Sequence, residues 1–349
     1  MIDTLKATVW RILAGLYFVS GMGWIWHRGR VVILTYHRVV SDHMVQDEHI
    51  QPGMYVRAQS FEAHINYLRK RFNIISLDEL LDLWQTNRLK SYHSYCVITF
   101  DDGWRDNYQF AFPLLMKYRI PATIFLATDF IGTARWFWPD QMMLLLEKGR
   151  QHTTSTADKR AFSTVLDEAI GVTMSEEDGI FRGVESGAPI DSDSIIECFK
   201  GVEVDRIHQI IDRLSRALHM DLPTQRVLLN WDEVREMAEK GVTFGSHSCS
   251  HRIMTQIPLP DVKTELIDSM ETMLQRGVKP VPVFCYPNGN FDRDIQELVR
   301  ESGYLAAVGC EVGLERDRPG DLFALKRITL HEDSSASAPL LAFVLSGFR

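Results

Sequence analysis

The sequence predicts an α/β fold in which about seven parallel strands close into a barrel surrounded by helices. Short apolar runs, each the length of one strand, alternate with longer segments in which apolar residues recur every three or four positions. This alternation is typical of parallel βαβ units. Polar and ionisable residues follow several of the apolar runs directly, which is where a barrel carries its chemistry.

The expected elements follow one another in a regular order on both sides of one long interruption. The helix expected at 107–118 ends before Ile120-Pro121, because proline disfavours the helical conformation of the residue before it. Ser60 is expected to cap the helix at 60–71. The expected strands are 31–35, 72–75, 96–100, 122–127, 242–245, 281–285, 305–308 and 324–330. The expected helices are 60–71, 77–85, 107–118, 231–240, 259–276 and 291–302.

Residues 132–229 interrupt this pattern with polar helical segments and loop-like sequence. We interpret them as a mainly helical insertion in a barrel formed by residues 31–131 and 230–335. Residues 336–349 are expected to form a C-terminal tail. The insertion is a plausible source of substrate selectivity, since loops and insertions on a rigid scaffold carry much of protein function.

Residues 1–30 are expected to form an apolar N-terminal helix. The run from residue 7 to residue 26 is about as long as a membrane span, but Arg11 lies inside it. A helix lying at the membrane interface fits the tryptophans and flanking basic residues as well as a span does. A helix packed on the main domain is the alternative. Association with a membrane is therefore expected, and the side, cytoplasmic face or periplasm, stays open.

The composition is that of a globular, acidic protein. Hydrophobic residues make up 45% of the chain and charged residues 24%. The net charge of −8 gives no electrostatic support for a nucleic-acid partner.

Two histidines and a pair of aspartates suggest a metal site. His247 and His251 are four residues apart, a spacing at which both imidazoles can reach one ion. Adding the carboxylate of Asp102 gives a set of ligands known from hydrolytic metal sites. Asp101 can then accept a proton from a water molecule, and Gly103 permits the sharp turn that follows.

Each of these patterns has an ordinary explanation when taken alone. Asp-Asp-Gly is usually a turn, and two histidines four apart are commonly packing or surface residues. Their coincidence at the ends of separate expected strands makes the ordinary explanation insufficient.

The combined motifs resemble those of the NodB-type polysaccharide deacetylases, carbohydrate esterase family 4. The matching stretches read V-I-T-F-D-D-G, F-G-S-H-S-C-S-H and F-C-Y-P-N-G, and they occur in the family's order. The earlier stretch I-L-T-Y-H-R-V resembles the branch that acts on exported or lipid-linked polysaccharides. The resemblance implies a distorted (β/α) barrel, the NodB homology fold, and a divalent metal that is most often zinc. It also implies hydrolysis of N-acetyl groups from hexosamines or of O-acetyl groups from xylan.

The resemblance assigns roles residue by residue. Asp101 corresponds to the catalytic base, Asp102 to the metal-binding aspartate, and His247 and His251 to the histidine ligands. Cys285 stands where the family usually has an arginine that orients the base. That support is therefore either absent or supplied by another part of the chain.

The family's general acid is a histidine near a strand end, and this chain offers two candidates. His37 follows the first expected strand, and His331 follows the last. We favour His37, because the branch with a Y-H-R-V stretch looks permuted so that this strand comes first.

The residues expected to contact substrate lie beside the Asp101-Asp102-Gly103 turn and in the C-Y-P-N-G stretch. Aromatic faces suit sugar rings, and a backbone N–H near Asn288 would stabilise an oxyanion. The expected substrate-binding residues are Trp104, Tyr286, Pro287 and Asn288.

We therefore expect a metal-dependent hydrolase that removes acetyl groups from an N-acetylated amino-sugar polysaccharide or its lipid-linked precursor. A catalytically inactive glycan-binding or assembly protein of the same fold is the main alternative, because the arginine is missing from its usual place. A phosphatase of the aspartyl-phosphate type is a weaker alternative, since the adjacent aspartates break that motif's spacing.

Overall fold

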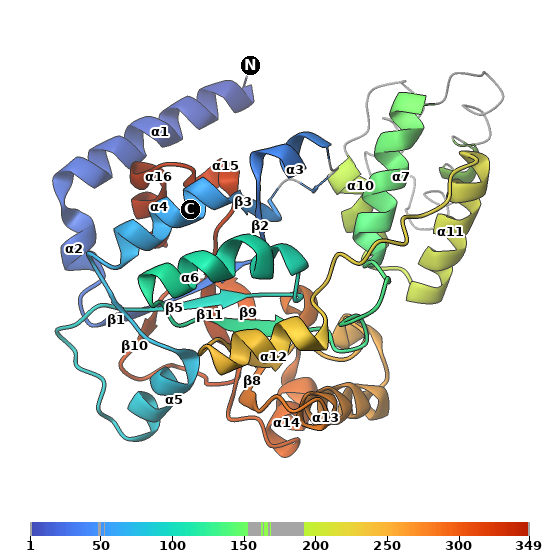
Figure 1. Ribbon diagram of the computed structural model, residues 1–349. Helices are drawn as coiled ribbons and strands as arrows, with labels where there is room; N and C mark the ends of the chain where they lie inside the picture. The colour runs from blue at the N-terminus through green and yellow to red at the C-terminus, as the bar shows by residue number, and fades with distance from the viewer. Residues whose placement is uncertain are drawn as a thin grey trace. The chain divides into compact units, whose positions relative to one another are not determined.

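The computed structural model describes residues 2–47, 50, 51, 53–152, 162, 164–166, 168 and 192–347. Its centre is a closed barrel of seven parallel strands, each paired with the next barrel strand along the chain (Figure 1). The last strand pairs with the first through Leu34 and Ile328, which closes the barrel. The expected barrel of about seven units is confirmed. Its strands are β1 (Arg30–Tyr36), β5 (Tyr95–Phe100), β6 (Thr123–Leu126), β7 (Thr243–Ser246), β8 (Pro280–Cys285), β9 (Ala306–Val312) and β11 (Leu325–Thr329).

Four short strands lie outside the barrel. The expected strand at 72–75 is reduced to β4 (Asn73–Ile74), which pairs only with the start of β5. β10 (Glu315–Arg316) pairs antiparallel with the start of β1. β2 (Arg38–Val40) and β3 (Tyr55–Arg57) form a separate two-stranded sheet. Strands of two or three residues leave too little periodicity in the sequence to be predicted.

Helices connect the barrel strands, and a capping side chain marks the start of three of them. Asn230 and Glu233 form a capping box at the start of α12. The expected helix at 291–302 begins two residues later, because Asp292 is its N-cap and accepts a hydrogen bond from the Ile295 N–H. These helices are α4 (Ala58–Leu68), α5 (Leu77–Gln85), α6 (Phe112–Tyr118), α12 (Trp231–Glu239), α13 (Leu259–Gln275) and α14 (Arg293–Glu301).

One local expectation was wrong, and another holds with a change in the type of helix. Ser60 does not cap its helix, which begins at Ala58; its hydroxyl donates instead to Glu332 Oε1 at 2.9 Å. The expected helix at 107–118 begins with a π-helical turn, Asn107–Ala111. Pro113 follows this turn and has no N–H to donate, which favours a widened turn over a regular α-helical one.

The two ends of the chain pack against each other. α1 (Ile2–Ser20) and α2 (Met22–Trp26) precede the barrel, while α15 (Glu332–Ser335) and α16 (Ala338–Leu345) follow it. The ring of Phe343 on α16 contacts both Trp10 and Tyr17 on α1, with centroids 5.1 and 5.8 Å apart. Among the described helices, none combines the length and the hydropathy needed to cross a bilayer.

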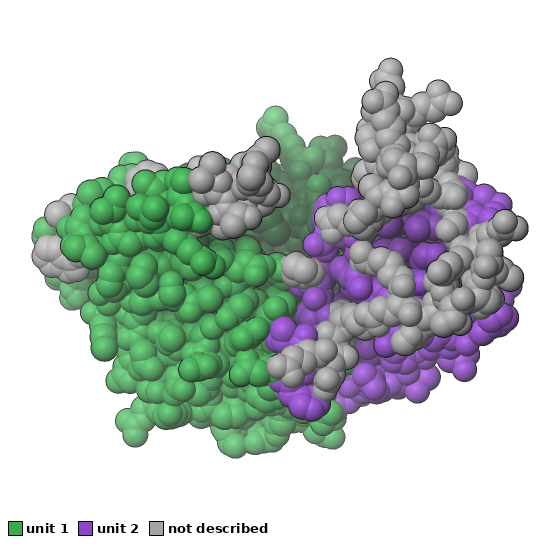
Figure 2. Space-filling model, turned by 90° about the horizontal axis from the view of Figure 1, so that it is seen from above, with its two compact units in different colours: residues 1–42, 53–133, 227–349 green, residues 43–52, 134–226 purple. Residues whose placement is uncertain are grey.

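The chain divides into two compact units, coloured separately in Figure 2. Unit 1 contains the barrel and comprises residues 1–42, 53–133 and 227–349. Unit 2, residues 43–52 and 134–226, has its own apolar core formed around α7 (Trp138–His152), α10 (Ser192–Phe199) and α11 (Val204–Ala217). α3 (Asp42–Asp47) begins at the boundary. Residues 169–191 of the expected insertion lie outside the described residues.

The inside of the barrel is apolar towards the amino ends of the strands and polar towards their carboxyl ends. Every second residue of a strand points inward. Val31, Val97 and Val283 belong to the buried core. Further along, Thr35 Oγ1 and Thr99 Oγ1 lie 3.3 Å apart. The same inward series continues past the strand ends to Asp101 on β5 and His247 on β7, so the barrel brings these residues to one end.

Candidate active site

The Asp-Asp-Gly turn places two carboxylates with different surroundings at the end of β5. The N–H of Asp101 donates to the carbonyl of Tyr36, which continues the pairing of β5 with β1. Asp102 then has a φ of 74° and Gly103 a φ of 81°. This left-handed turn reverses the direction of the chain, so both carboxylates are buried on the same end of the barrel. The positive φ of residue 103 favours glycine, and a Cβ there would also lie 2.8 Å from Leu126 Cδ2.

Asp102, His247 and His251 form a compact set of potential metal ligands. Asp102 Oδ1 lies 3.4 Å from His247 Nε2 and 3.2 Å from His251 Nε2. The ligand atoms all lie within 4.8 Å of one another. In a tetrahedral zinc site with bonds of about 2.0–2.1 Å, neighbouring ligand atoms are about 3.3 Å apart. The three side chains therefore fit a divalent metal.

The two histidines are oriented by backbone groups and by α13. His247 Nδ1 lies 2.8 Å from the carbonyl oxygen of Cys285, so Nδ1 carries a proton, and Nε2 is the ring nitrogen that faces Asp102. The loop after His247 is fixed by Glu265, which accepts hydrogen bonds from the N–H groups of Cys249 and Ser250 at 2.7 and 2.9 Å. The spacing of four residues is thus realised on a tight loop, with His251 at a φ of 60°.

The carboxyl group of Asp102 is strongly favoured in its ionised form. Burial opposes ionisation, but the hydrogen bonds with His247 and His251 outweigh burial and hold the pKa of Asp102 well below its ordinary value. A buried anion between two imidazoles is a suitable cation site, because the cation would compensate the charge.

Trp104 supports Asp102 and does not present an open face to a sugar. Its side chain is only 2% exposed, and its indole N–H donates to Asp102 Oδ2 at 2.8 Å. Because Oδ2 accepts this hydrogen bond, Oδ1 is the oxygen that faces the two histidines. The expectation that Trp104 stacks on substrate is therefore corrected: it is a positioning residue for a potential metal ligand.

Arg38 and Asp106 hold Trp104 in place, and both were missed in the sequence. The guanidinium of Arg38 lies 4.5 Å from the centre of the Trp104 ring, which covers one face of the indole. Arg38 Nε in turn donates to Asp106 Oδ2 at 2.7 Å, and both residues are buried. The only signal in the sequence was two charged residues close to the expected motifs.

Arg327 supplies the arginine that is missing from the Cys-Tyr-Pro-Asn-Gly stretch. Its Nη1 and Nη2 donate to the two oxygens of Asp101, each at 2.8 Å. Its Nε donates to the carbonyl of Gly309, and Nη2 lies 3.3 Å from Cys285 Sγ. Cys285 therefore occupies the usual arginine position, while the guanidinium itself arrives from β11. The small cysteine side chain leaves room for it.

Arg327 also sets the protonation state of Asp101. Burial opposes ionisation of this carboxyl, but the charge of Arg327 and its hydrogen bonds outweigh burial and hold the pKa of Asp101 below its ordinary value. Asp101, His247 and Cys285 form a second group of potential ligand atoms within 4.8 Å. Of the two groups, the Asp102 set is the better candidate for a cation, because both oxygens of Asp101 already bind Arg327 and burial raises the pKa of the Cys285 thiol.

His37 and His331 follow the ends of neighbouring strands at the same level. Thr35 and Thr329 are partners in the pairing of β1 with β11. Each histidine lies two residues after one of these threonines, so His37 and His331 extend the same register. His37 contributes to the electrostatic field at Asp101 and Asp102, which lie on the strand beside β1. In the described part of the chain, its buried Nδ1 has no hydrogen-bond partner. His331 begins α15, where its carbonyl accepts from Ser335 N.

The Cys-Tyr-Pro-Asn-Gly stretch presents less side chain to solvent than expected. Tyr286 is fully buried, its ring stacks on Phe291, and its hydroxyl donates to the carbonyl of Phe323. Pro287 is buried as well. The expected substrate contacts of these two side chains are therefore corrected: both belong to the core. Asn288 is exposed, and its φ of 57° makes a sharp turn there.

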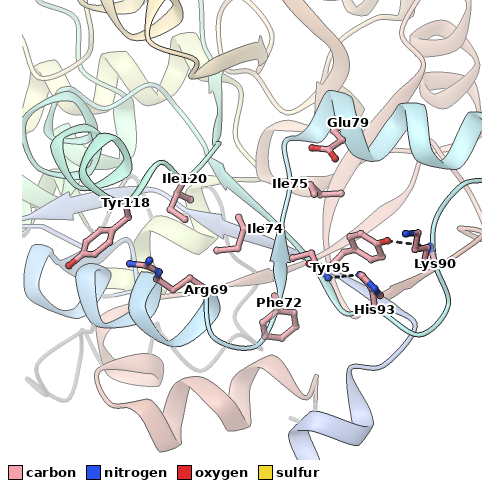
Figure 3. Close-up of a pocket in the computed structure, with 11 residues that line it drawn as sticks. Arg69, Phe72, Ile74, Ile75, Glu79, Lys90, His93, Tyr95, Tyr118 and Ile120 are labelled. Atoms are coloured by element: carbon pink, nitrogen blue, oxygen red, sulfur yellow. Dashed lines mark hydrogen bonds between the residues drawn. The ribbon is translucent and has the colours of Figure 1, made fainter.

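An open pocket of about 540 Å³ lies at the other end of β5 (Figure 3). It is lined in part by Tyr95, the first residue of β5, whereas Asp101 follows the last. At about 3.3 Å per residue the two lie roughly 20 Å apart, so this pocket is separate from the carboxylates and histidines. Its lining residues are Arg69, Phe72, Asn73, Ile74, Ile75, Glu79, Lys90, His93, Tyr95, Tyr118 and Ile120.

The sequence profile of the polysaccharide deacetylases matches residues 90–182 and 207–307, more than half of the chain. The protein belongs to the polysaccharide deacetylase family. This is a family of enzymes, and the match includes Asp101, Asp102, His247 and His251. The resemblance inferred from the motifs is confirmed.

Individual relatives agree with this assignment. YxkH of Bacillus subtilis strain 168, whose name places it among the polysaccharide deacetylases, is 31% identical over 129 residues. The matched stretch covers 37% of this chain and 43% of YxkH, which is less than half of the relative's length.

Solved structures share the fold across most of the length of this chain. The deacetylase PplD of Streptococcus pyogenes, in complex with acetate, superimposes with a TM-score of 0.55 at 15% identity, covering 92% of this chain and 99% of PplD. IcaB of Ammonifex degensii gives 0.54 at 16% identity, covering 91% and 97%. A de-N-acetylase of Aggregatibacter actinomycetemcomitans gives 0.53 at 17% identity, covering 90% and 99%. At these identities the likeness concerns the fold.

Proposed function

We propose that this deacetylase is a divalent-metal-dependent hydrolase that removes acetyl groups from an N-acetylated amino-sugar polysaccharide or from its lipid-linked precursor. The observation that carries the proposal is the pairing of two differently supported carboxylates. Asp102 lies against His247 and His251, while Asp101 beside it is held by Arg327. One carboxylate is thus arranged for a cation and the other for a proton.

A divalent cation held by Asp102, His247 and His251 would supply a water molecule of lowered pKa and a positive charge for the acetyl oxygen. Zinc suits a set of two imidazoles and one carboxylate, with open positions for water and substrate. Trp104 holds the second oxygen of Asp102, which fixes the orientation of the carboxylate.

The remaining steps are assigned to residues of this chain. Asp101 accepts a proton from the water as its oxygen attacks the acetyl carbon, and Arg327 keeps both oxygens of Asp101 in position. The C–N bond then breaks. His37, in its protonated form, gives a proton to the departing sugar amine, and acetate leaves. A backbone N–H near Asn288 is available as a donor to the developing oxyanion.

Two structural neighbours support the removal of acetyl groups, and one of them supports removal from nitrogen. One of them is named a de-N-acetylase, and another was solved with acetate, the product expected here. The Tyr-His-Arg-Val stretch of the lipid-linked branch ends in β2, and Arg38 from it belongs to the support of Trp104. The contact of this branch-specific stretch with Trp104 supports the proposal.

Two other functions are less well supported. The inactive glycan-binding alternative depended on a missing arginine, and Arg327 now occupies that role. The phosphatase alternative leaves the histidine pair unexplained and does not agree with the family match.

Acetate release from N-acetylated chito-oligosaccharides tests the proposal. We expect the purified chain to lose activity after dialysis against a chelator and to recover it with zinc. Asp101→Asn should abolish release while retaining bound metal by elemental analysis, because the amide cannot accept the proton.

Asp294→Asn is the matched control, since this exposed aspartate lies in the first turn of α14. It should leave acetate release unchanged. The proposal fails if folded, zinc-loaded protein releases no acetate from any N-acetylated glycan tested, or if Asp101→Asn remains as active as the wild type.

A further inference from the structure

The outward side of α1 carries a continuous apolar stripe formed by Val9, Ile12, Leu13, Leu16 and Val19. Their exposed fractions range from 46 to 85%. The residues stand at positions 9, 12, 13, 16 and 19, a pattern in which each has a partner three or four positions away, so they lie along one side of the helix. Large apolar side chains scattered singly over a surface are ordinary, but a stripe of this kind indicates an interaction surface.

The stripe is distinct from the side of α1 that packs on the protein. Ala14 and Tyr17 are buried, and Tyr17 contacts Phe343 of α16. α1 therefore has two apolar sides, one packed on the C-terminal helix and one exposed. Figure 1 shows α1 at the periphery of the fold, beside α16. The helix does not need the stripe for its own docking, because that role is taken by the buried side.

The charge around α1 indicates what the stripe contacts. Residues 2–30, from the start of α1 to the start of β1, contain four lysines or arginines and one aspartate, although the whole chain has a net charge of −8. The exposed run Arg69-Lys70-Arg71 follows α4, and the guanidinium of Arg71 lies 5.9 Å from the ring of Phe18 on α1. An apolar stripe bordered by basic residues is complementary to an anionic lipid surface.

A second copy of the chain fits the stripe less well. Two copies joined through α1 would bring two positively charged segments together, whereas a bilayer offers apolar tails and negative headgroups. The described part of the chain has no helix able to cross a bilayer, so the contact is with the membrane surface. We propose that the deacetylase binds anionic membranes through this stripe, with α1 lying in the interface. This inference is independent of the proposed activity.

Vesicle flotation of the full-length chain tests the inference. We expect it to float with vesicles of phosphatidylcholine and phosphatidylglycerol, and to bind vesicles of phosphatidylcholine alone much more weakly. The double variant Leu13→Gln and Leu16→Gln should reduce binding to the anionic vesicles by about tenfold or more, because two inserted side chains become polar. Glutamine keeps helix propensity, so α1 should still form.

The matched control makes the same change elsewhere. Leu259→Gln and Leu274→Gln alter two leucines of α13 that are 44 and 56% exposed, and this variant should float like the wild type. The inference is overturned if the wild type binds neither vesicle type, if it binds both equally, or if the α1 variant floats as well as the control. A dimer in light scattering that the α1 variant converts to a monomer would assign the stripe to a second copy and also overturn it.

Discussion

Arg327 holds Asp101 by two parallel hydrogen bonds of 2.8 Å, although the two residues are 226 positions apart in the sequence. Both are almost completely buried, so the pair is shielded from water on the inside of the barrel. A planar guanidinium matches the two carboxylate oxygens and fixes the plane of the carboxylate as well as its charge. The proposed base, Asp101, is thus oriented by a residue of β11, the strand on the other side of β1 from β5.

Replacing Arg327 by lysine should separate orientation from charge. Arg327→Lys keeps a positive charge but cannot make both hydrogen bonds, so we expect kcat to fall by about 10- to 100-fold. The pKa of Asp101 should rise, because Arg327 is what holds it low. Since the ionised form is the base, the acidic limb of the kcat/KM profile should move to higher pH. Arg293→Lys, on the surface of α14, is the control; an unshifted limb in Arg327→Lys would contradict the assigned role.

Trp104→Phe should weaken metal binding without removing a ligand. The change deletes the N–H that holds Asp102 Oδ2, while the phenyl ring keeps most of the packing against Arg38. Loss of such a supporting hydrogen bond typically lowers metal affinity by about 10- to 100-fold. Zinc titration by calorimetry should show this, with kcat at saturating zinc changed far less. Trp231→Phe, at a buried indole outside the site, should leave the affinity unchanged.

The sequence predicted the local parts of the site better than its long-range supports. Asp101 and Asp102 are adjacent, and His247 and His251 are four residues apart, so each pair is visible as a motif. Arg327 left one signal that could have been used. In the strand Leu325–Thr329 it stands two residues after Leu325, at the alternate position that points inward, and a buried arginine requires an acidic partner. The alternation predicts the direction of this side chain, but the partner depends on how the barrel closes.

The errors concern residues whose role is decided by another segment. Trp104 follows the Asp-Asp-Gly turn, and nothing in the sequence tells whether its ring faces substrate or Asp102. Arg38 and Asp106 decide this: the guanidinium of Arg38 lies over the indole ring, and Asp106 holds that guanidinium by a hydrogen bond. Tyr286 is similar, because Phe291 and the carbonyl of Phe323 draw it into the core. The barrel itself was predictable, since its strand–helix alternation is repeated along the chain.

Asparagine variants of His37 and His331 should identify the general acid. We expect His37→Asn to lower kcat/KM on N-acetylated glycans by about 10²- to 10⁴-fold, since the sugar amine needs a proton to depart. His331→Asn should change it only slightly. With an aryl acetate, whose leaving group needs no proton, the loss in His37→Asn should be much smaller. A large loss in His331→Asn that disappears with the aryl acetate would instead assign the acid to His331.

His64 should make the protein's stability depend on mild acid. It is buried, and its Nε2 lies 2.8 Å from the carbonyl of Ser335, so Nε2 carries the proton and Nδ1 accepts from the Tyr36 hydroxyl at 3.2 Å. Burial lowers the pKa of His64 to about 4 in the folded protein, against about 6.5 when unfolded. The unfolded chain therefore takes up the proton first, and the stability contribution is complete above pH 6.5 and lost as the pH falls towards 4. The free energy of unfolding in urea should drop by about 2 kcal/mol more between pH 7 and pH 5 in the wild type than in His64→Gln. The exposed His208→Gln on α11 should retain the wild-type drop, and an equal drop in all three proteins would refute the role of His64.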